Sequence, residues 1–254
     1  MAEARSQSAS SAARDPVDDL VKKLRLRDEV SDREAKVLRD AIAEVQKIPA
    51  GRTLVRTGQA ISQSTLLIDG LIARYKDLSD GQRQIMELHV AGDFVDLHGF
   101  LLKRLDHNVG ALTAVSVGFV PHEALARITA EEPHLSRMLW LSTLMDASIQ
   151  REHILSMGRR PALARIGHLL CELCIRLEVI GLAENRGFAL PLTQLDLADA
   201  TGLTAIHVNR MLRQLRERKL LTFRGGRVEI HDWEALQALS EFDPTYLHLE
   251  RRPR

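Results

Sequence analysis

The chain has 254 residues, of which 45% are apolar and 27% are charged, and its net charge is +1. This length suits one large domain or two modest ones. No apolar run reaches the length of a membrane span, the first residues lack the apolar stretch of a secretory signal, and two cysteines cannot build a disulfide framework. We therefore expect a cytoplasmic protein with no membrane contact.

The chain begins with a polar segment, MAEARSQSASSAARDP, over residues 1–16. It has nothing to bury and is predicted to be a disordered tail. A transit peptide is the alternative, and Glu3 and Asp15 count against it because such peptides carry few acidic residues. Residues 17–44 then show helical periodicity, with Asp18 or Asp32 as the expected caps.

From about residue 46 to residue 121 the pattern changes to short strand-like runs, among them TLLIDGLIARYKDL, RQIMELHV and ALTAVSVGFV. Glycines at positions 51, 58, 70, 81 and 92 separate these runs, most of them 11 or 12 residues apart. The stretch SDGQ at 79–82 is typical of a hairpin turn. Short strands at this spacing favour an antiparallel sandwich, roll or barrel, within a module over residues 17–133.

A short helix, PHEALARITAEEP, follows the strands and ends at Pro133. Residues 134–158 then predict a helix roughly 36 Å long. Its apolar residues cover more than one stripe, so it is expected to lie between two surfaces. One surface is the strand-rich module, and the second is either a copy of this helix in another subunit or more of the same chain's core. In the dimer interpretation the interface residues are Leu135, Met138, Leu141, Met145 and Ile149.

The stretch GRRP at 158–161 marks the expected domain boundary, and Pro161 suits the first turn of a following helix. Residues 159–240 are predicted to form a second module, and residues 241–254 a C-terminal tail. Residues 159–230 hold 12 Arg and Lys against 7 Asp and Glu, whereas the rest of the chain is slightly acidic. This asymmetry favours nucleic acid as a partner, although a run of charge is more often a solvated face.

The most informative stretch is TQLDLADATGLTAIHVNRMLRQLRERKLL, residues 193–221. Its spacing predicts two helices joined by a three-residue corner. The small Ala198 lets the helices approach, Gly202 takes the positive φ that the corner requires, and Thr204 caps the second helix. Leu203 and Val208 fill the gap between the helices. These features predict a helix-turn-helix.

The second helix divides into an inward apolar face and an outward face that carries asparagine and arginine. In a major groove Arg grips guanine and Asn grips adenine. The stretch LLTFRGGRVEIHDW predicts a hairpin turning at Gly225-Gly226, with an arginine on each side to meet phosphates. An ordinary helical hairpin with a solvated basic face is the alternative. The predicted DNA-binding residues are Thr193, Thr204, Ala205, Ile206, His207, Asn209, Arg210, Arg213, Arg224 and Arg227.

This order of parts resembles the Crp/Fnr family, named after the bacterial cyclic-AMP receptor protein and the fumarate–nitrate regulator. The resemblance covers about residues 46–240 and is most specific in VNRMLRQL, where Arg210 stands at the arginine that the family uses on a guanine. It implies an α+β fold: an N-terminal β-roll of the cyclic-nucleotide-binding type (a double-stranded β-helix), a dimerisation helix and a C-terminal winged helix-turn-helix. It also implies a homodimeric transcription factor that binds double-stranded DNA and contacts RNA polymerase.

Two departures from the family pattern matter. Ala205 and Ile206 stand where the cyclic-AMP receptor protein has Arg-Glu, so we expect a different operator, read partly through a thymine methyl group. In GDFVDLHGFLLKRLDHNVGALTA, residues 92–114, Asp96-Leu97 replaces the family's Gly-Glu pair and His107-Asn108 replaces its Arg-Ser pair. A buried phosphodiester loses its hydration, and without the arginine of the Arg-Ser pair no fixed cation compensates for that cost.

Cyclic AMP is therefore not expected as the effector. Lys103 or Arg104 is an alternative cation, although both fit a solvated loop better. We expect an unknown small molecule instead, in a pocket with Asp96, His98, His107 and Asn108.

No metal or cofactor is predicted. An iron–sulfur cluster of the family's type needs four cysteines, and this chain has Cys171 and Cys174, in the apolar stretch IGHLLCELCIRL. Buried thiols are the favoured interpretation and a redox role is the alternative. His89, His98 and His107, with Asp96, offer haem or metal ligands, although histidines of this kind are more often structural.

No enzyme motif of the P-loop, nucleophile-elbow or zincin type occurs, so an enzyme is not expected. The sequence predicts a Crp/Fnr-type regulator on a palindromic operator. The alternative is a β-roll module whose winged helix docks a protein. Salt dependence distinguishes the two, because duplex binding weakens steeply as counterions are released.

Overall fold

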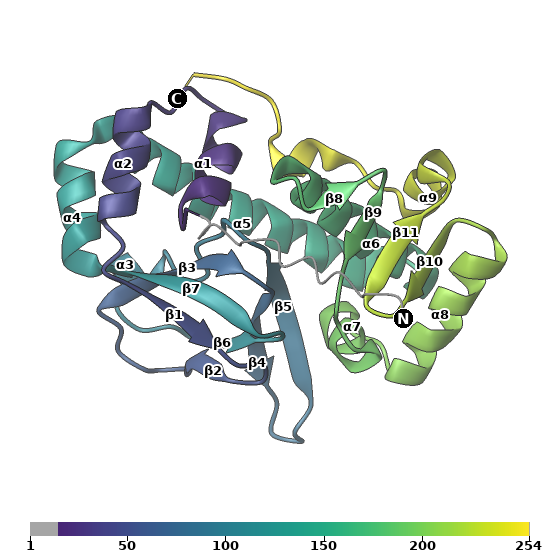
Figure 1. Ribbon diagram of the computed structural model, residues 1–254. Coiled ribbons are helices and arrows are strands. Elements are labelled where there is room, and N and C mark those ends of the chain that lie inside the picture. The colour runs from purple at the N-terminus through teal and green to yellow at the C-terminus, as the bar shows by residue number, and fades with distance from the viewer. Residues whose placement is uncertain (1–14, 254) are drawn as a thin grey trace, which may run out of the picture.

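The computed structural model describes residues 15–253, so nearly all of the predicted tail at 1–16 lies outside the described residues. Helix α1 spans Asp18–Arg25 and α2 spans Asp32–Asp40 (Figure 1). The prediction that an aspartate caps these helices was wrong. Val17 precedes α1 and makes no side-chain cap, whereas Ser31 accepts a hydrogen bond from the Glu34 backbone at the start of α2. Asp32 already lies in the first turn, where its charge favours the helix dipole.

Seven antiparallel strands between residues 44 and 121 form two facing sheets. They are β1 Glu44–Ile48, β2 Thr53–Val55, β3 Gln63–Asp69, β4 Ile72–Asp77, β5 Arg83–His89, β6 Asn108–Ala111 and β7 Val115–Pro121. One sheet has the order β1-β7-β3 and the other β2-β6-β4-β5. Leu67, Ile72 and Val117 are fully buried between the two sheets. The predicted roll is confirmed, and the turn at 79–82 joins β4 to β5.

The roll contains one short helix, and two longer helices follow it. The short α3 spans Gly99–Leu102, α4 spans His122–Glu131, and α5 spans Pro133–Arg159. Pro133 occupies the first turn of α5, where its missing N–H costs nothing. Helix α5 runs from α4 past the roll to the C-terminal half of the molecule (Figure 1).

The C-terminal half is a winged helix-turn-helix. Its elements are α6 Ala162–Val179, β8 Ala183–Glu184, β9 Gly187–Ala189, α7 Gln194–Thr201, α8 Ala205–Glu217, β10 Leu221–Arg224, β11 Arg227–Ile230 and α9 Trp233–Ser240. The sheet order is β10-β11-β9-β8. Gly225 and Gly226 both have positive φ and form the predicted two-residue turn between β10 and β11.

The roll and the winged helix share a continuous hydrophobic core. The predicted boundary at 158–161 coincides with the junction of α5 and α6, but buried packing crosses that junction. Side chains from β4 and β5, among them Ala73, Ile85 and Leu88, belong to the same buried cluster as Leu170 and Leu173 of α6. Among the described residues, no helix is both long and apolar enough to cross a membrane.

The predicted C-terminal tail is a packed segment. After α9 a short 3₁₀ helix, η1, spans Pro244–Leu247, and the chain then returns toward α1 (Figure 1). The Tyr246 hydroxyl donates to Glu172 of α6 at 2.8 Å. Arg27 of the α1 region donates to the Leu247 carbonyl at 2.8 Å and accepts from the Arg252 backbone at 2.9 Å. This C-terminal segment therefore joins the winged helix to the N-terminal helices.

Candidate nucleic-acid interface and sensor cavity

The corner between α7 and α8 has the geometry that its sequence predicts. Thr193 and Asp196 form a reciprocal capping box at the start of α7. Gly202 takes φ +63°, the left-handed conformation that favours glycine. Thr204 caps α8 by accepting a hydrogen bond from the His207 backbone at 3.2 Å. Three residues, 202–204, separate the two helices, as expected of a helix-turn-helix.

Helix α8 presents an apolar face to the core and a basic face to solvent. Val208, Met211 and Leu215 are buried, whereas the Ile206 side chain is 84% exposed. An isoleucine so exposed on a polar face is available for an apolar contact with a partner.

The polar residues of this face are exposed and differ in how they are held. Asn209 donates to Gln194 of α7 at 3.3 Å, and Arg213 pairs with Glu217 at 2.7 Å. Arg210 makes no hydrogen bond or ion pair with any residue in 15–253 and is available for a ligand. Ala205 and His207 are half-buried instead, because they face the β4–β5 hairpin. These two predicted DNA contacts are thus less accessible than the sequence suggested.

The hairpin β10–β11 places two arginines at its tip. Arg224 and Arg227 are cross-strand partners beside the turn, and both are exposed. Arg227 lies 3.3 Å from Glu229, which offsets part of its charge. The tip therefore offers cations to an anionic partner next to α8.

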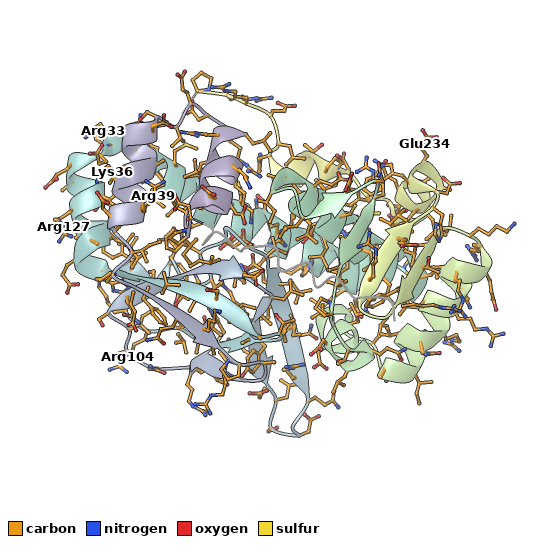
Figure 2. The ribbon with its side chains drawn as sticks, in the orientation of Figure 1. Arg33, Lys36, Arg39, Arg104, Arg127 and Glu234 are labelled. Atoms are coloured by element: carbon orange, nitrogen blue, oxygen red, sulfur yellow. The ribbon has the colours of Figure 1, made fainter. Side chains whose placement is uncertain are left out.

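Another group of cations lies on α2, at the end of the roll away from α8 (Figure 2). Arg33 pairs with Glu132, Lys36 with Asp40, and Arg39 with Asp15. Because each has a carboxylate partner, this surface is a weaker candidate for an anionic ligand than the face of α8.

A cavity of about 530 Å³ lies between the roll and α5. His98 and His107 line it, with ring centroids 5.3 Å apart, as the sequence predicted. Asp96 and Asn108 do not line it, which corrects the other half of the predicted pocket. The Asp96 carboxylate accepts from the Thr65 backbone and hydroxyl, and Asn108 contacts Thr57 and Asp77.

The cavity's cation is Arg74, which sequence reasoning missed. Neither Lys103 nor Arg104 lines the cavity. Arg74 is 2% exposed and donates to Glu87 of β5 at 2.8 Å and to Asp146 of α5 at 2.9 Å. The signal was present in the period of β4, which places Arg74 on the same inward face as Ile72.

Burial sets the protonation of the groups around the cavity. It raises the pKa of Glu87 to about 8, and the Asp146 carboxylate acts in the same direction while Arg74 opposes it. It lowers the pKa of His98 to about 3 and also lowers the pKa of His107. Both imidazoles are therefore neutral at pH 7, and the guanidinium is already held by two carboxyl groups. No group of three or more His, Cys, Asp or Glu residues suited to a metal ion occurs within residues 15–253.

Helix α5 has the two apolar faces that its sequence predicted, but the residues divide differently. Leu135, Met138 and Ile149 are buried in the chain's own core, so they cannot supply an intersubunit surface. Of the predicted interface residues, only Leu141 and Met145 remain partly exposed. The open face carries the exposed Trp140, Leu144, Arg151, Ile154 and Gly158 and the half-buried Ala147, at alternating spacings of four and three residues. That spacing is typical of a coiled-coil seam.

The two cysteines are fully buried in α6 and are not bonded to each other. Burial raises the pKa of each thiol to about 12. A thiol is reactive as its thiolate, so this environment favours the structural interpretation of Cys171 and Cys174.

A basic recognition helix with a wing, joined through a long helix to a β-roll, defines a DNA-binding transcription regulator. Comparisons with known proteins agree. The model of the Crp-like helix-turn-helix domain matches residues 164–239, and the model of the cyclic nucleotide-binding domain matches residues 45–132.

Proteins of similar sequence are described as transcriptional activators. The chain is 30% identical over 172 residues to a probable transcriptional activator of Rhizobium leguminosarum bv. viciae, covering 68% of this chain and 70% of that protein. It is 28% identical over 181 residues to the transcriptional activator protein FnrL of Cereibacter sphaeroides, covering 70% and 72%. The structure of FixK2 from Bradyrhizobium japonicum aligns with a TM-score of 0.71 at 27% identity, covering 78% of this chain and 97% of that one. The chain belongs to the Crp/Fnr family of transcription regulators.

Proposed function

We propose that this regulator binds a two-fold operator as a homodimer, with one α8 helix in each of two successive major grooves. The observation that carries the proposal is the outward face of α8, where Arg210 is unpaired among the described residues beside the exposed Ile206. Two exposed arginines, Arg224 and Arg227, stand at the adjacent hairpin tip. DNA supplies a phosphate for such cations.

The residues of this surface divide into two roles. Arg210 lies one turn beyond Ile206 on the outward face, so it grips a guanine while Ile206 contacts a thymine methyl group. Thr193 and Thr204 lie at the starts of α7 and α8, where helix N-termini attract phosphate. Arg224 at the wing tip contacts neighbouring phosphates of the DNA backbone, and this contact adds no sequence preference.

The sensor cavity takes a ligand other than a cyclic nucleotide. A phosphodiester needs an available cation, and the buried Arg74 guanidinium already donates to Glu87 and Asp146. The two neutral imidazoles of His98 and His107 offer hydrogen bonds to an uncharged polar group instead. We propose further that the protein acts in the cytoplasm and contacts RNA polymerase, because relatives of this chain are described as transcriptional activators.

The test is selection of bound duplexes from a random pool by the purified full-length protein. We expect a palindromic consensus whose half-sites lie one helical turn apart, about 34 Å. Affinity for that duplex should fall steeply as salt is raised. If no sequence is enriched and binding is insensitive to salt, the winged helix does not read DNA.

A further inference from the structure

The β4–β5 hairpin of the roll contacts the first helix of the helix-turn-helix directly (Figure 1). Arg83, the first residue of β5, donates through Nε to Asp199 at 2.7 Å and through Nη2 to Asp196 at 2.8 Å. Gln84 donates to the Asp199 carbonyl at 2.7 Å. The partners are 113 to 116 residues apart in the chain, so this contact is purely tertiary.

The two ion pairs are partly shielded from water. The side chain of Arg83 is 27% exposed, and those of Asp196 and Asp199 are each 15% exposed. The Arg83 guanidinium carbon also lies over the ring of Tyr75 of β4, 5.6 Å from its centroid. Shielded charges of this kind are less screened by salt than fully exposed pairs. Each edge of the guanidinium fork holds a different carboxylate, which fixes the position of α7 relative to the hairpin.

Asp196 also holds the N-terminus of α7. Its Oδ2 accepts from the Thr193 backbone at 3.0 Å and from the Thr193 hydroxyl at 2.6 Å, while Oδ1 accepts from Arg83. The same carboxylate therefore links the hairpin to the capping box. Any rotation of Asp196 away from Arg83 disturbs the helix end that faces phosphates in the proposed complex.

The hairpin also controls charge at that helix end. Asp196 and Asp199 place two carboxylates on the first two turns of α7, next to the proposed path of a polyanion. Arg83 cancels one of these charges. An open cleft of about 960 Å³ lies between the hairpin and the helix-turn-helix, with Gln82 on one side and Thr204 on the other. The hairpin thus borders the approach to the N-terminus of α8.

We propose that Arg83, a residue of the sensor roll, is a positioning residue for DNA recognition. It fixes the capping carboxylate of α7 and offsets the negative charge that α7 would otherwise present to the DNA backbone. The inference rests on the proposed DNA-binding function and extends it, because it makes the placement of the helix-turn-helix depend on the roll.

The test measures affinity of the full-length protein for its selected duplex by fluorescence anisotropy. Arg83→Ala should weaken binding about five- to tenfold, the size of a typical coupling between sites, with the preferred sequence unchanged. Lys76→Ala is the matched control, because Lys76 on β4 of the same hairpin pairs with Asp106 within the roll at 2.9 Å and does not reach α7. This control should bind as the wild type does.

Two further variants separate positioning from a loss of folding. Arg83→Lys keeps a cation between Asp196 and Asp199 and should recover at least half of the affinity lost in Arg83→Ala, on a logarithmic scale. Thr193→Ala combined with Arg83→Ala should lose less than the sum of the two single effects, because both changes act on the Asp196 carboxylate.

The outcomes distinguish this inference from the proposed function. A wild-type protein that binds no duplex contradicts the proposed function. If the wild type binds and Arg83→Ala binds equally well or more tightly, the inference is wrong. A folded Arg83→Lys variant with no recovery, or an equal loss in Lys76→Ala, also overturns it.

Discussion

Replacing the two exposed apolar residues Trp140 and Leu144 of α5 with glutamate should convert the regulator from a dimer to a monomer. Trp140 is 67% exposed and Leu144 is 52% exposed in the single chain. Both lie on the coiled-coil spacing of α5, away from the roll. Because neither side chain contributes to the buried core of the subunit, the double variant Trp140→Glu with Leu144→Glu should still fold.

The magnitude follows from the exposed area. Two-thirds of a tryptophan is about 100–170 Å², whose burial contributes roughly 2.5–4 kcal/mol. A two-fold interface buries two copies, so Trp140 alone accounts for roughly 5–8 kcal/mol before the cost of association. Replacing it with a charge removes that contribution and adds desolvation. The dimer dissociation constant should therefore rise at least about a thousandfold.

Sedimentation equilibrium at micromolar protein measures this change, with the thermal unfolding midpoint as a check on folding. Leu101→Glu is the matched control, because Leu101 is 78% exposed on α3, outside the seam. The wild type and this control should be dimers, and the double variant a monomer. A wild type that is monomeric at micromolar concentration, or a double variant that remains dimeric, would refute the assignment of the seam.

The remaining predictions concern the operator, the effector and acid stability. Arg210→Ala should cost about 1–3 kcal/mol and relax preference at one base pair per half-site, whereas Arg224→Ala should weaken all duplexes alike and flatten the salt dependence by about one unit per subunit. Anisotropy titrations against single-base operator variants check this, and a uniform loss in both would show that Arg210 contacts only phosphate. Millimolar cyclic AMP should shift neither the Tm nor the operator affinity, although a site filled to 100 times its Kd would add about 2.7 kcal/mol. Stability should fall as the pH is lowered from 6.5 toward 3, because buried His98, whose folded pKa is about 3, takes up its proton later than in the unfolded chain. His98→Gln should reduce the change in the free energy of unfolding with pH, measured by urea denaturation, by up to about 1.4 kcal/mol per pH unit. An unchanged pH dependence would contradict the burial argument.

The helix-turn-helix was predictable because its rules are local. The left-handed Gly202 and the Thr204 cap act within a few residues of themselves, so their spacing in the sequence specifies the corner. The hairpin at Gly225-Gly226 follows for the same reason. The spacing of glycines between short strand-like runs likewise predicted the strands of the roll.

The sequence could not show which surfaces of distant segments pack against each other. Both faces of α5 are apolar, and nothing in the helix distinguishes the face that meets the roll from the face left exposed. Leu135 and Met138 were therefore assigned to the wrong one. Arg74 was missed because an arginine inside a strand-like run is usually a surface residue. The contact between Arg83 and Asp199 spans 116 residues and has no local signature.

The packed C-terminal segment has a practical consequence for experiments on this protein. Its last described residues lie beside α1, held by the Arg252 backbone on Arg27, and not beside the wing that precedes them in the chain. A fluorophore attached at residue 252 would therefore report on the N-terminal helices of the roll. Energy transfer from a donor on the wing to such a label would follow the separation of the two halves directly.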